Sequence, residues 1–212
     1  MDVSRITRRA ASYPEGLALL REAAPDAIEL LGQTSLLHLP KLALFCSVRC
    51  PASLIAQAHE VAVRLANQSY VVAGGFQSPV EREAFALLAR GTVPLLVGVA
   101  RRLEGMPVAK PWRRPLSQGR LLALSPIRGA SPPDASAAWF RNRVMAALSD
   151  IVLMLHASPG GKSAALCQEV KRWNKKVLAL DHPANAYLSV DGVTLDTPTG
   201  LVERLAEAMA GR

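Results

Sequence analysis

Asp150-Ile-Val-Leu-Met-Leu-His-Ala-Ser-Pro-Gly-Gly-Lys-Ser163 is the stretch of this 212-residue chain that decides its fold. Residues 151–155 are apolar and uncharged, which is typical of a strand buried on both faces, and residues 164–173 follow with a helical pattern. A strand, a glycine turn and a helix form an anion site in α/β proteins, because glycines let the backbone approach a phosphate and the first helical N–H groups point at it. The stretch therefore predicts an α/β protein that holds a phosphorylated ligand or a nucleic-acid backbone.

The same alternation of apolar runs and helical patterns extends from residue 41 to the end of the chain. Uninterrupted apolar strands between helices predict a mostly parallel sheet that is covered on both faces. We therefore expect an open, Rossmann-like α/β fold with ligands at the carboxyl ends of its strands. The expected strands are residues 42–46, 70–73, 93–99, 119–124, 151–155 and 176–180, and the expected helices are residues 52–67, 79–89, 134–148, 164–173 and 199–210.

Residues 1–40 are expected to form a short helical appendage to the Rossmann-like domain of residues 41–212. Residues 14–24 and 26–31 have helical patterns, and Pro25 separates them. Helices this short are not stable alone, so the segment should pack on the domain or on a partner.

The composition favours a globular cytoplasmic protein with a polyanionic partner. Hydrophobic residues make up 50% of the chain and charged residues 20%, which allows a large core. The 25 Lys and Arg against 17 Asp and Glu give a net charge of +8, a balance typical of proteins that bind polyanions. No secretory signal pattern is visible, and no apolar run approaches the ~20 residues that span a bilayer. We therefore expect no association with membranes.

Histidines and cysteines show no spacing that suits a metal. The three cysteines also form no disulfide framework, and no order of Ser, His and Asp indicates nucleophilic catalysis. We therefore expect no metal and no cofactor, and we assign none of these residues as catalytic.

Candidate ligand-binding residues follow two of the expected strands before residue 90. Ser47 and Arg49 offer a hydroxyl and a guanidinium after the first strand, and Gly74 and Gly75 allow close approach of a ligand after the second. Ser78 is either a further phosphate contact or the N-cap of the next helix. Glu81 is either an acid/base or ribose contact, or a first-turn glutamate that favours the helix dipole.

Two arginines flank an amide within the expected helix of residues 134–148. Arg141 and Arg143 lie two positions apart, so on a regular helix their side chains diverge by roughly 200°. One of them is expected to reach the ligand while the other pairs with an acid elsewhere.

The glycine turn of residues 160–163 invites comparison with a nucleotide-hydrolysing phosphate loop, G-x-x-x-x-G-K-[ST]. His156 stands where that motif has its first glycine, which favours a passive anion cradle over hydrolysis. The full set of candidate phosphate-binding or nucleic-acid-binding residues is Ser47, Arg49, Gly74, Gly75, Ser78, Arg141, Asn142, Arg143, Gly160, Gly161, Lys162 and Ser163.

The segment Trp139-Phe-Arg-Asn-Arg-Val-Met-Ala-Ala-Leu-Ser149 resembles the F-x-R-N-R-I-I-A-G-L-S pattern of the DprA/Smf family of DNA-processing proteins. Ser47-Val-Arg49 is similar to the family's G-S-R, Ala73-Gly74 to its S-G, and the glycine turn to its later serine/glycine loop. The resemblance covers about residues 41–185. It implies a Rossmann-like fold, a role in DNA uptake and recombination, single-stranded DNA binding in a basic groove, and a recombinase partner. A homodimer is left open.

This chain departs from the family pattern in one motif. Where the family has G-I-D-x-x-A-H, the chain has a segment one residue longer, in which Glu81 replaces the aspartate and Phe85 the histidine. The chain therefore resembles a divergent branch. It also resembles, more distantly, the LOG phosphoribohydrolases, whose P-G-G-x-G-T-x-x-E is similar to residues 159–167, but Cys167 replaces the glutamate.

Two functions remain open at the level of sequence. The first is non-enzymatic binding of single-stranded DNA, with phosphates held by the basic residues and bases stacked on Trp112 or Trp139. The second is a sensor or hydrolase of a nucleotide-derived small ligand, with Glu81 as its acid or base. We favour the first and expect no catalysis.

Overall fold

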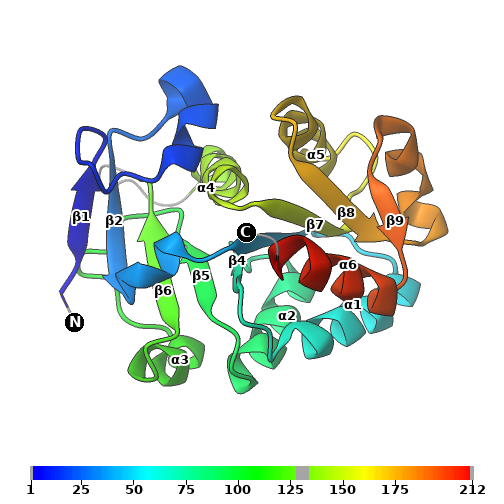
Figure 1. The fold of residues 1–212 in the computed structure, drawn as a ribbon, viewed down its shortest axis with the longest axis horizontal. Helices are drawn as coiled ribbons and strands as arrows, with labels where there is room; N and C mark the ends of the chain where they lie inside the picture. The colour runs from blue at the N-terminus through cyan, green and yellow to red at the C-terminus, as the bar shows by residue number, and fades with distance from the viewer. Residues whose placement is uncertain (1, 128–133, 211–212) are drawn as a thin grey trace.

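Nine strands form a single mixed sheet in the computed structural model, which describes residues 2–127 and 134–210 (Figure 1). The strands lie in the order β1-β2-β6-β5-β4-β3-β7-β8-β9. They are β1 (Ser4–Thr7), β2 (Ala27–Gly32), β3 (Lys41–Cys46), β4 (Val71–Gly74), β5 (Leu95–Gly98), β6 (Leu121–Ser125), β7 (Ile151–His156), β8 (Lys176–Leu180) and β9 (Thr194–Asp196). From β6 to β9 all neighbours are parallel, and β1 and β2 are antiparallel additions at one edge.

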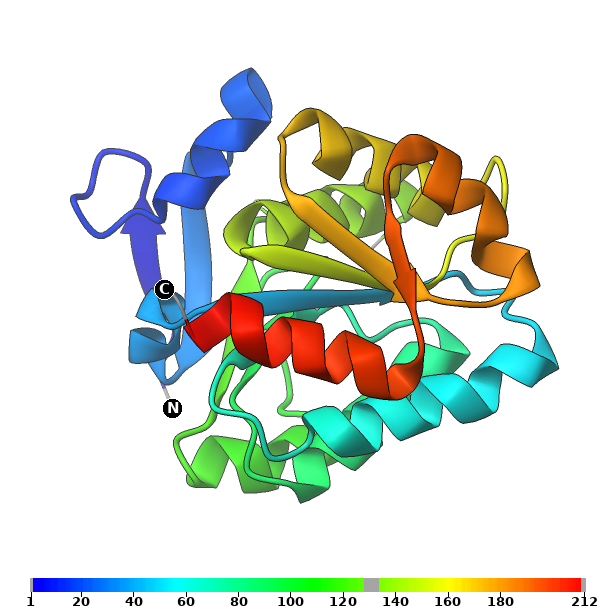
Figure 2. The ribbon, with the colours of Figure 1, turned by 45° about the vertical axis from the view of Figure 1, so that its right-hand side comes forward.

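Helices cover both faces of this sheet, which confirms the Rossmann-like prediction (Figure 2). The helices are α1 (Ala52–Leu65), α2 (Pro79–Arg90), α3 (Arg113–Ser117), α4 (Ala135–Leu148), α5 (Lys162–Arg172) and α6 (Pro198–Ala210), and the 3-10 helices are η1 (Glu15–Ala23), η2 (Thr34–His38), η3 (Lys110–Trp112) and η4 (Pro183–Asp191). Helices α1, α2 and α6 pack on one face, and α4, α5 and η1 pack on the other.

The central strands feed two separate hydrophobic cores because their side chains alternate between the faces. In β3, Leu42 and Leu44 pack with α1 and α2, whereas Ala43 and Phe45 face α4. All six residues of β3 and of β7 are buried, which is why neither strand shows a polar alternation in the sequence.

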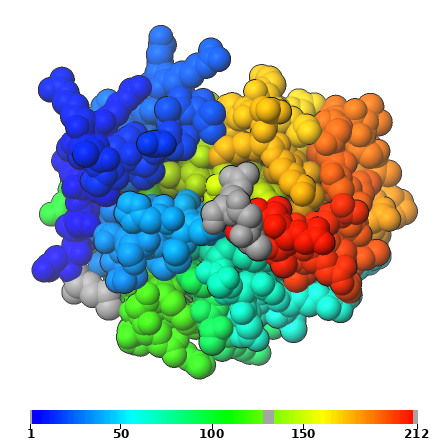
Figure 3. Space-filling model, viewed as in Figure 1, coloured from blue at the N-terminus to red at the C-terminus, as the bar shows by residue number. Residues whose placement is uncertain are grey.

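The N-terminal segment differs from its prediction. Residues 26–31 do not form a helix: β2 occupies Ala27–Gly32 and pairs antiparallel with both β1 and β6. In the structure, Ile28 and Leu30 face one core and Leu31 faces the other, as the alternation of a strand requires. In a segment of only six residues, this alternation of apolar side chains cannot be distinguished from the apolar pattern of a short helix. The segment therefore extends the sheet. Figure 3 shows it, in blue, lying against the rest of the molecule.

The connections of β3 create a switch point in the sheet. From β3 the chain builds outward through β4, β5 and β6 on one side, and it then returns to place β7 on the other side of β3. The loops that leave the carboxyl ends of β3 and β7 therefore diverge, and such a crevice is where open α/β sheets bind ligands. None of the helices in the described ranges has the length and hydropathy of a membrane-spanning segment.

Candidate anion-binding site

A cavity of about 450 Å³ lies at this switch point, beyond the carboxyl ends of β3 and β7. The turn after β3, the start of α2, the first half of α4 and the start of α5 line it. Among the predicted residues, those that line it are Ser47, Arg49, Ser78, Glu81, Arg141, Asn142, Gly161, Lys162 and Ser163, and those that do not are Gly74, Gly75, Arg143 and Gly160.

Hydrogen bonds between two loops form the floor of the cavity. The Ser47 hydroxyl accepts from the Ser158 N–H at 2.8 Å, and the Ser158 hydroxyl donates to the Arg49 carbonyl at 3.2 Å. The Ser47 N–H also donates to the His156 carbonyl at 2.8 Å. Ser47 therefore positions the two loops, and Ser158, which the sequence did not single out, is its partner directly before the glycine turn.

Helix α5 begins in the cavity without a side-chain cap. Gly160 adopts φ +68°, a left-handed conformation that glycine accepts without strain, and Gly161 precedes the first helical residue, Lys162. The uncapped N–H groups carry positive partial charge, and the exposed Lys162 side chain adds a full charge beside them. A cation at this end of a helix is unfavourable by itself, so the arrangement is suited to an anion.

Ser78 and Glu81 form a capping box at the start of α2. The Ser78 hydroxyl accepts from the Glu81 N–H at 3.3 Å. The Glu81 carboxylate, only 6% exposed, accepts from the N–H groups of Cys46, Gln77 and Ser78 at 2.9, 2.8 and 3.2 Å. The geometry thus corresponds to an N-cap role for Ser78 and to a role for Glu81 as a first-turn glutamate of α2. Through its bond to Cys46, Glu81 also connects the end of β3 to α2.

We expect Glu81→Gln to lower the free energy of unfolding by about 2 kcal/mol, because the amide NH2 takes the place of one carboxylate oxygen and faces the N–H groups from which that oxygen accepted. Denaturant unfolding measures the change. Glu83→Gln, an exposed neighbour, is the matched control and should change stability by less than about 0.5 kcal/mol. Equal effects of the two substitutions would contradict this role.

Arg141 is buried between two glycines. Its side chain is 2% exposed and Nη1 donates to the Gly98 carbonyl at 2.9 Å. A Cβ on Gly75 would lie 2.2 Å from the Arg141 Cζ, and a Cβ on Gly98 would lie 2.7 Å from its Cδ. Burial lowers the pKa of the guanidinium, and the Glu81 carboxylate opposes that shift. The space at Gly75 therefore accommodates Arg141, not a ligand as predicted from the sequence.

Arg143 points away from the cavity and pairs with α5. Its Nε lies 2.9 Å from both Glu169 carboxylate oxygens, and its Nη2 lies 2.6 Å from Oε1. The divergence predicted from the spacing is confirmed: Arg141 lines the cavity and Arg143 pairs with an acid. The geometry does not support the predicted phosphate contact of Arg143.

Arg143→Glu is expected to destabilise the fold by about 2 kcal/mol, because the change places two carboxylates together at a site where each side chain is about one-fifth exposed. Thermal unfolding measures it. The double variant Arg143→Glu/Glu169→Arg should recover most of the loss. If the double variant is no more stable than the single one, the ion pair does not account for the effect.

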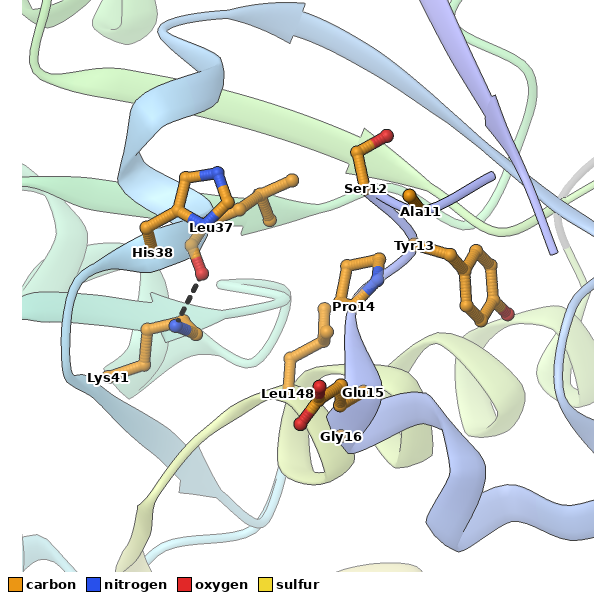
Figure 4. A pocket seen from close by; sticks show the side chains of 10 residues that line it. All are labelled: Ala11, Ser12, Tyr13, Pro14, Glu15, Gly16, Leu37, His38, Lys41 and Leu148. Carbon is orange, nitrogen blue, oxygen red and sulfur yellow. Dashed lines mark hydrogen bonds between the residues drawn. The ribbon is translucent and has the colours of Figure 1, made fainter. Parts of the chain in front are cut away.

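A smaller cavity of about 300 Å³ lies at the opposite, amino end of β3 (Figure 4). Its buried cation, Lys41, donates to the carbonyls of Leu37 and Leu39 at 2.9 and 2.5 Å. Burial lowers the pKa of Lys41, and Asp150 opposes that shift. Because the ammonium is committed to backbone carbonyls, this cavity is a weaker candidate for an anion. Across residues 2–127 and 134–210, no group of three or more His, Cys, Asp or Glu side chains is arranged to hold a metal ion.

Two DNA processing proteins have similar structures. The protein from Streptococcus pneumoniae matches with a TM-score of 0.78 and 20% identity over 93% of this chain and 72% of its own. The protein from Helicobacter pylori matches with a TM-score of 0.80 and 18% identity over 98% of this chain and 97% of its own. A molybdenum cofactor carrier protein from Chlamydomonas reinhardtii is a more distant match, with a TM-score of 0.54 and 15% identity over 81% of this chain and 99% of its own.

These likenesses show the fold, and the sequence itself shows the family. No curated protein matches the chain. The family model described as DNA recombination-mediator protein A, in contrast, matches residues 4–195, which include every strand but part of β9 and every loop of the cavity. The chain belongs to the family of DNA recombination-mediator protein A, the DNA processing proteins.

Proposed function

We propose that this chain binds single-stranded DNA without catalysis, with the sugar–phosphate backbone in the cavity at the switch point. The observation that carries the proposal is Lys162 at the uncapped start of α5, with Arg49 on another loop of the same cavity. Two exposed cations and a set of free helical N–H groups converge there, a combination suited to phosphates.

Membership of the family supports this choice of anion. The similar Helicobacter pylori protein is described as having a unique single-stranded DNA binding mode. The net charge of +8 favours a polyanion over a neutral ligand. Trp139 and Asn142 line the cavity next to the cations and offer a stacking surface and an amide to a base. A recombinase partner and a homodimer remain predictions from the family resemblance.

A nucleotide-derived small ligand is the second candidate, because a cavity of about 450 Å³ falls in the range of small-molecule sites. Thermal unfolding with a dT20 oligonucleotide or with single nucleotides separates the two. We expect dT20 to raise the unfolding temperature at micromolar concentration, and dTMP or dAMP to do so only at far higher concentration. Stabilisation by a mononucleotide with none by dT20 would overturn the DNA proposal.

A further inference from the structure

Beside the cavity at the switch point, which is called the first cavity from here on, lies a second cavity of about 460 Å³, beyond the carboxyl end of β5. The loop after β5 and the 3-10 helix η3 form its outer wall, with Met106, Pro107 and Trp112. The indole of Trp112 is partly buried against the core on that side and lines the cavity. The cavity thus combines one aromatic side chain with apolar neighbours.

The two cavities are neighbours on the same edge of the sheet. They share Gln77, Ala138 and Arg141 as lining residues. Ala138 and Arg141 lie three positions apart on α4, so they present one helical face between the cavities. In the sheet, β4 alone separates β3 from β5, which places the two carboxyl ends roughly 10 Å apart.

The polar groups of the second cavity suit the edge of a planar heterocycle. The Nε of Arg141 is buried and has no hydrogen-bond partner among the described residues. Gln77 also lines the cavity, with its Nε2 donating to the Gly75 carbonyl at 3.1 Å, and the exposed Arg101 adds a cation. The Asp134 carboxylate caps α4 by accepting from the N–H groups of Ser136 and Ala137. A purely apolar ligand would leave the Arg141 Nε without a partner, whereas a nucleobase offers both a stacking face and hydrogen-bonding atoms.

We infer that the second cavity is a base-binding subsite, in which Trp112 stacks on a base of the same DNA strand whose backbone enters the first cavity. This inference rests on the proposed function and extends it: the binding site covers several nucleotides and crosses α4 at Ala138 and Arg141.

Tryptophan fluorescence tests whether the bound DNA contacts Trp112. The variant Trp139→Phe/Trp173→Phe leaves Trp112 as the single tryptophan and keeps an aromatic ring at both replaced positions. We expect saturating dT6 to quench its emission. Trp112→Phe/Trp139→Phe is the matched control, since its remaining Trp173 lies at the end of α5, away from both cavities, and should be unaffected.

Affinity provides the second readout. Trp112→Leu keeps apolar bulk but removes the stacking face, so it should weaken dT6 binding roughly tenfold, whereas Trp112→Phe should bind nearly as well as the unmodified chain. Unchanged dT6 affinity in Trp112→Leu, or unquenched Trp112 emission with dT6 bound, would overturn the subsite and leave the first cavity's role standing. Absence of dT6 binding to the unmodified chain would overturn both.

Discussion

Lys162→Glu is expected to weaken binding of a dT20 oligonucleotide by about 10- to 100-fold at ~0.1 M salt. The substitution removes a cation from the cavity and places a carboxylate at the start of α5, where the proposal puts a phosphate. Fluorescence anisotropy of a labelled oligonucleotide measures the change.

The same substitution should leave the fold intact and even stabilise it slightly. A carboxylate in the first turn of a helix interacts favourably with the helix dipole, by about 0.3–1 kcal/mol, whereas a lysine interacts unfavourably. Arg172→Glu is the matched control, because Arg172 is exposed at the other end of α5, about 15 Å along the helix. If the two variants lose equal affinity for dT20, the loss follows from the change in net charge alone, and the DNA-binding site does not include Lys162.

Gly75→Ala is expected to lower the free energy of unfolding by about 3 kcal/mol, or the unfolding temperature by roughly 6–12 °C. A Cβ at this position would lie 2.2 Å from Cζ and 2.3 Å from Nη1 of the Arg141 guanidinium, which is buried and hydrogen-bonded to Gly98. The guanidinium must then leave its position between the cavities, so DNA binding should fall as well.

Two comparisons isolate this clash. Gly105→Ala introduces the same methyl group where no atom lies within 4 Å, and its φ of +70° costs only about 1 kcal/mol. In a double-mutant cycle, Gly75→Ala should cost less when Arg141 is already alanine, because the clashing group is gone. Additive costs would show that Arg141 is not what requires glycine at position 75.

The parallel strands β3 to β8 were predictable because their interiors are apolar and, except between β5 and β6, helices of 11 to 14 residues separate them. β2 was not predictable, because its six residues fit the apolar pattern of a strand and of a helix equally well. Its partner β6 also lies about ninety positions later in the chain. β9 was missed for a related reason: its three residues, Thr194–Asp196, are each half-buried and carry little apolar signal.

The candidate site was predictable in its position but not in its internal contacts. Residues that follow strands, such as Ser47 and Lys162, line the cavity as expected, because parallel strands bring their carboxyl ends to one edge. Gly75 was misinterpreted because the group that fills its space, Arg141, lies 66 positions away and no local pattern relates the two. Glu81 likewise accepts from the backbone N–H of Cys46, which lies 35 positions earlier in the chain.

The slope of log affinity against log salt concentration, measured for dT20 with the unmodified chain and with Lys162→Gln, tests the central claim most directly. Each phosphate contact contributes about −0.7 to that slope on a single strand, because a bound cation releases a counterion. We predict that Lys162→Gln makes the slope shallower by about 0.7 as well as weakening binding. An identical slope for the two proteins would show that Lys162 contacts no phosphate and would contradict DNA binding at this cavity.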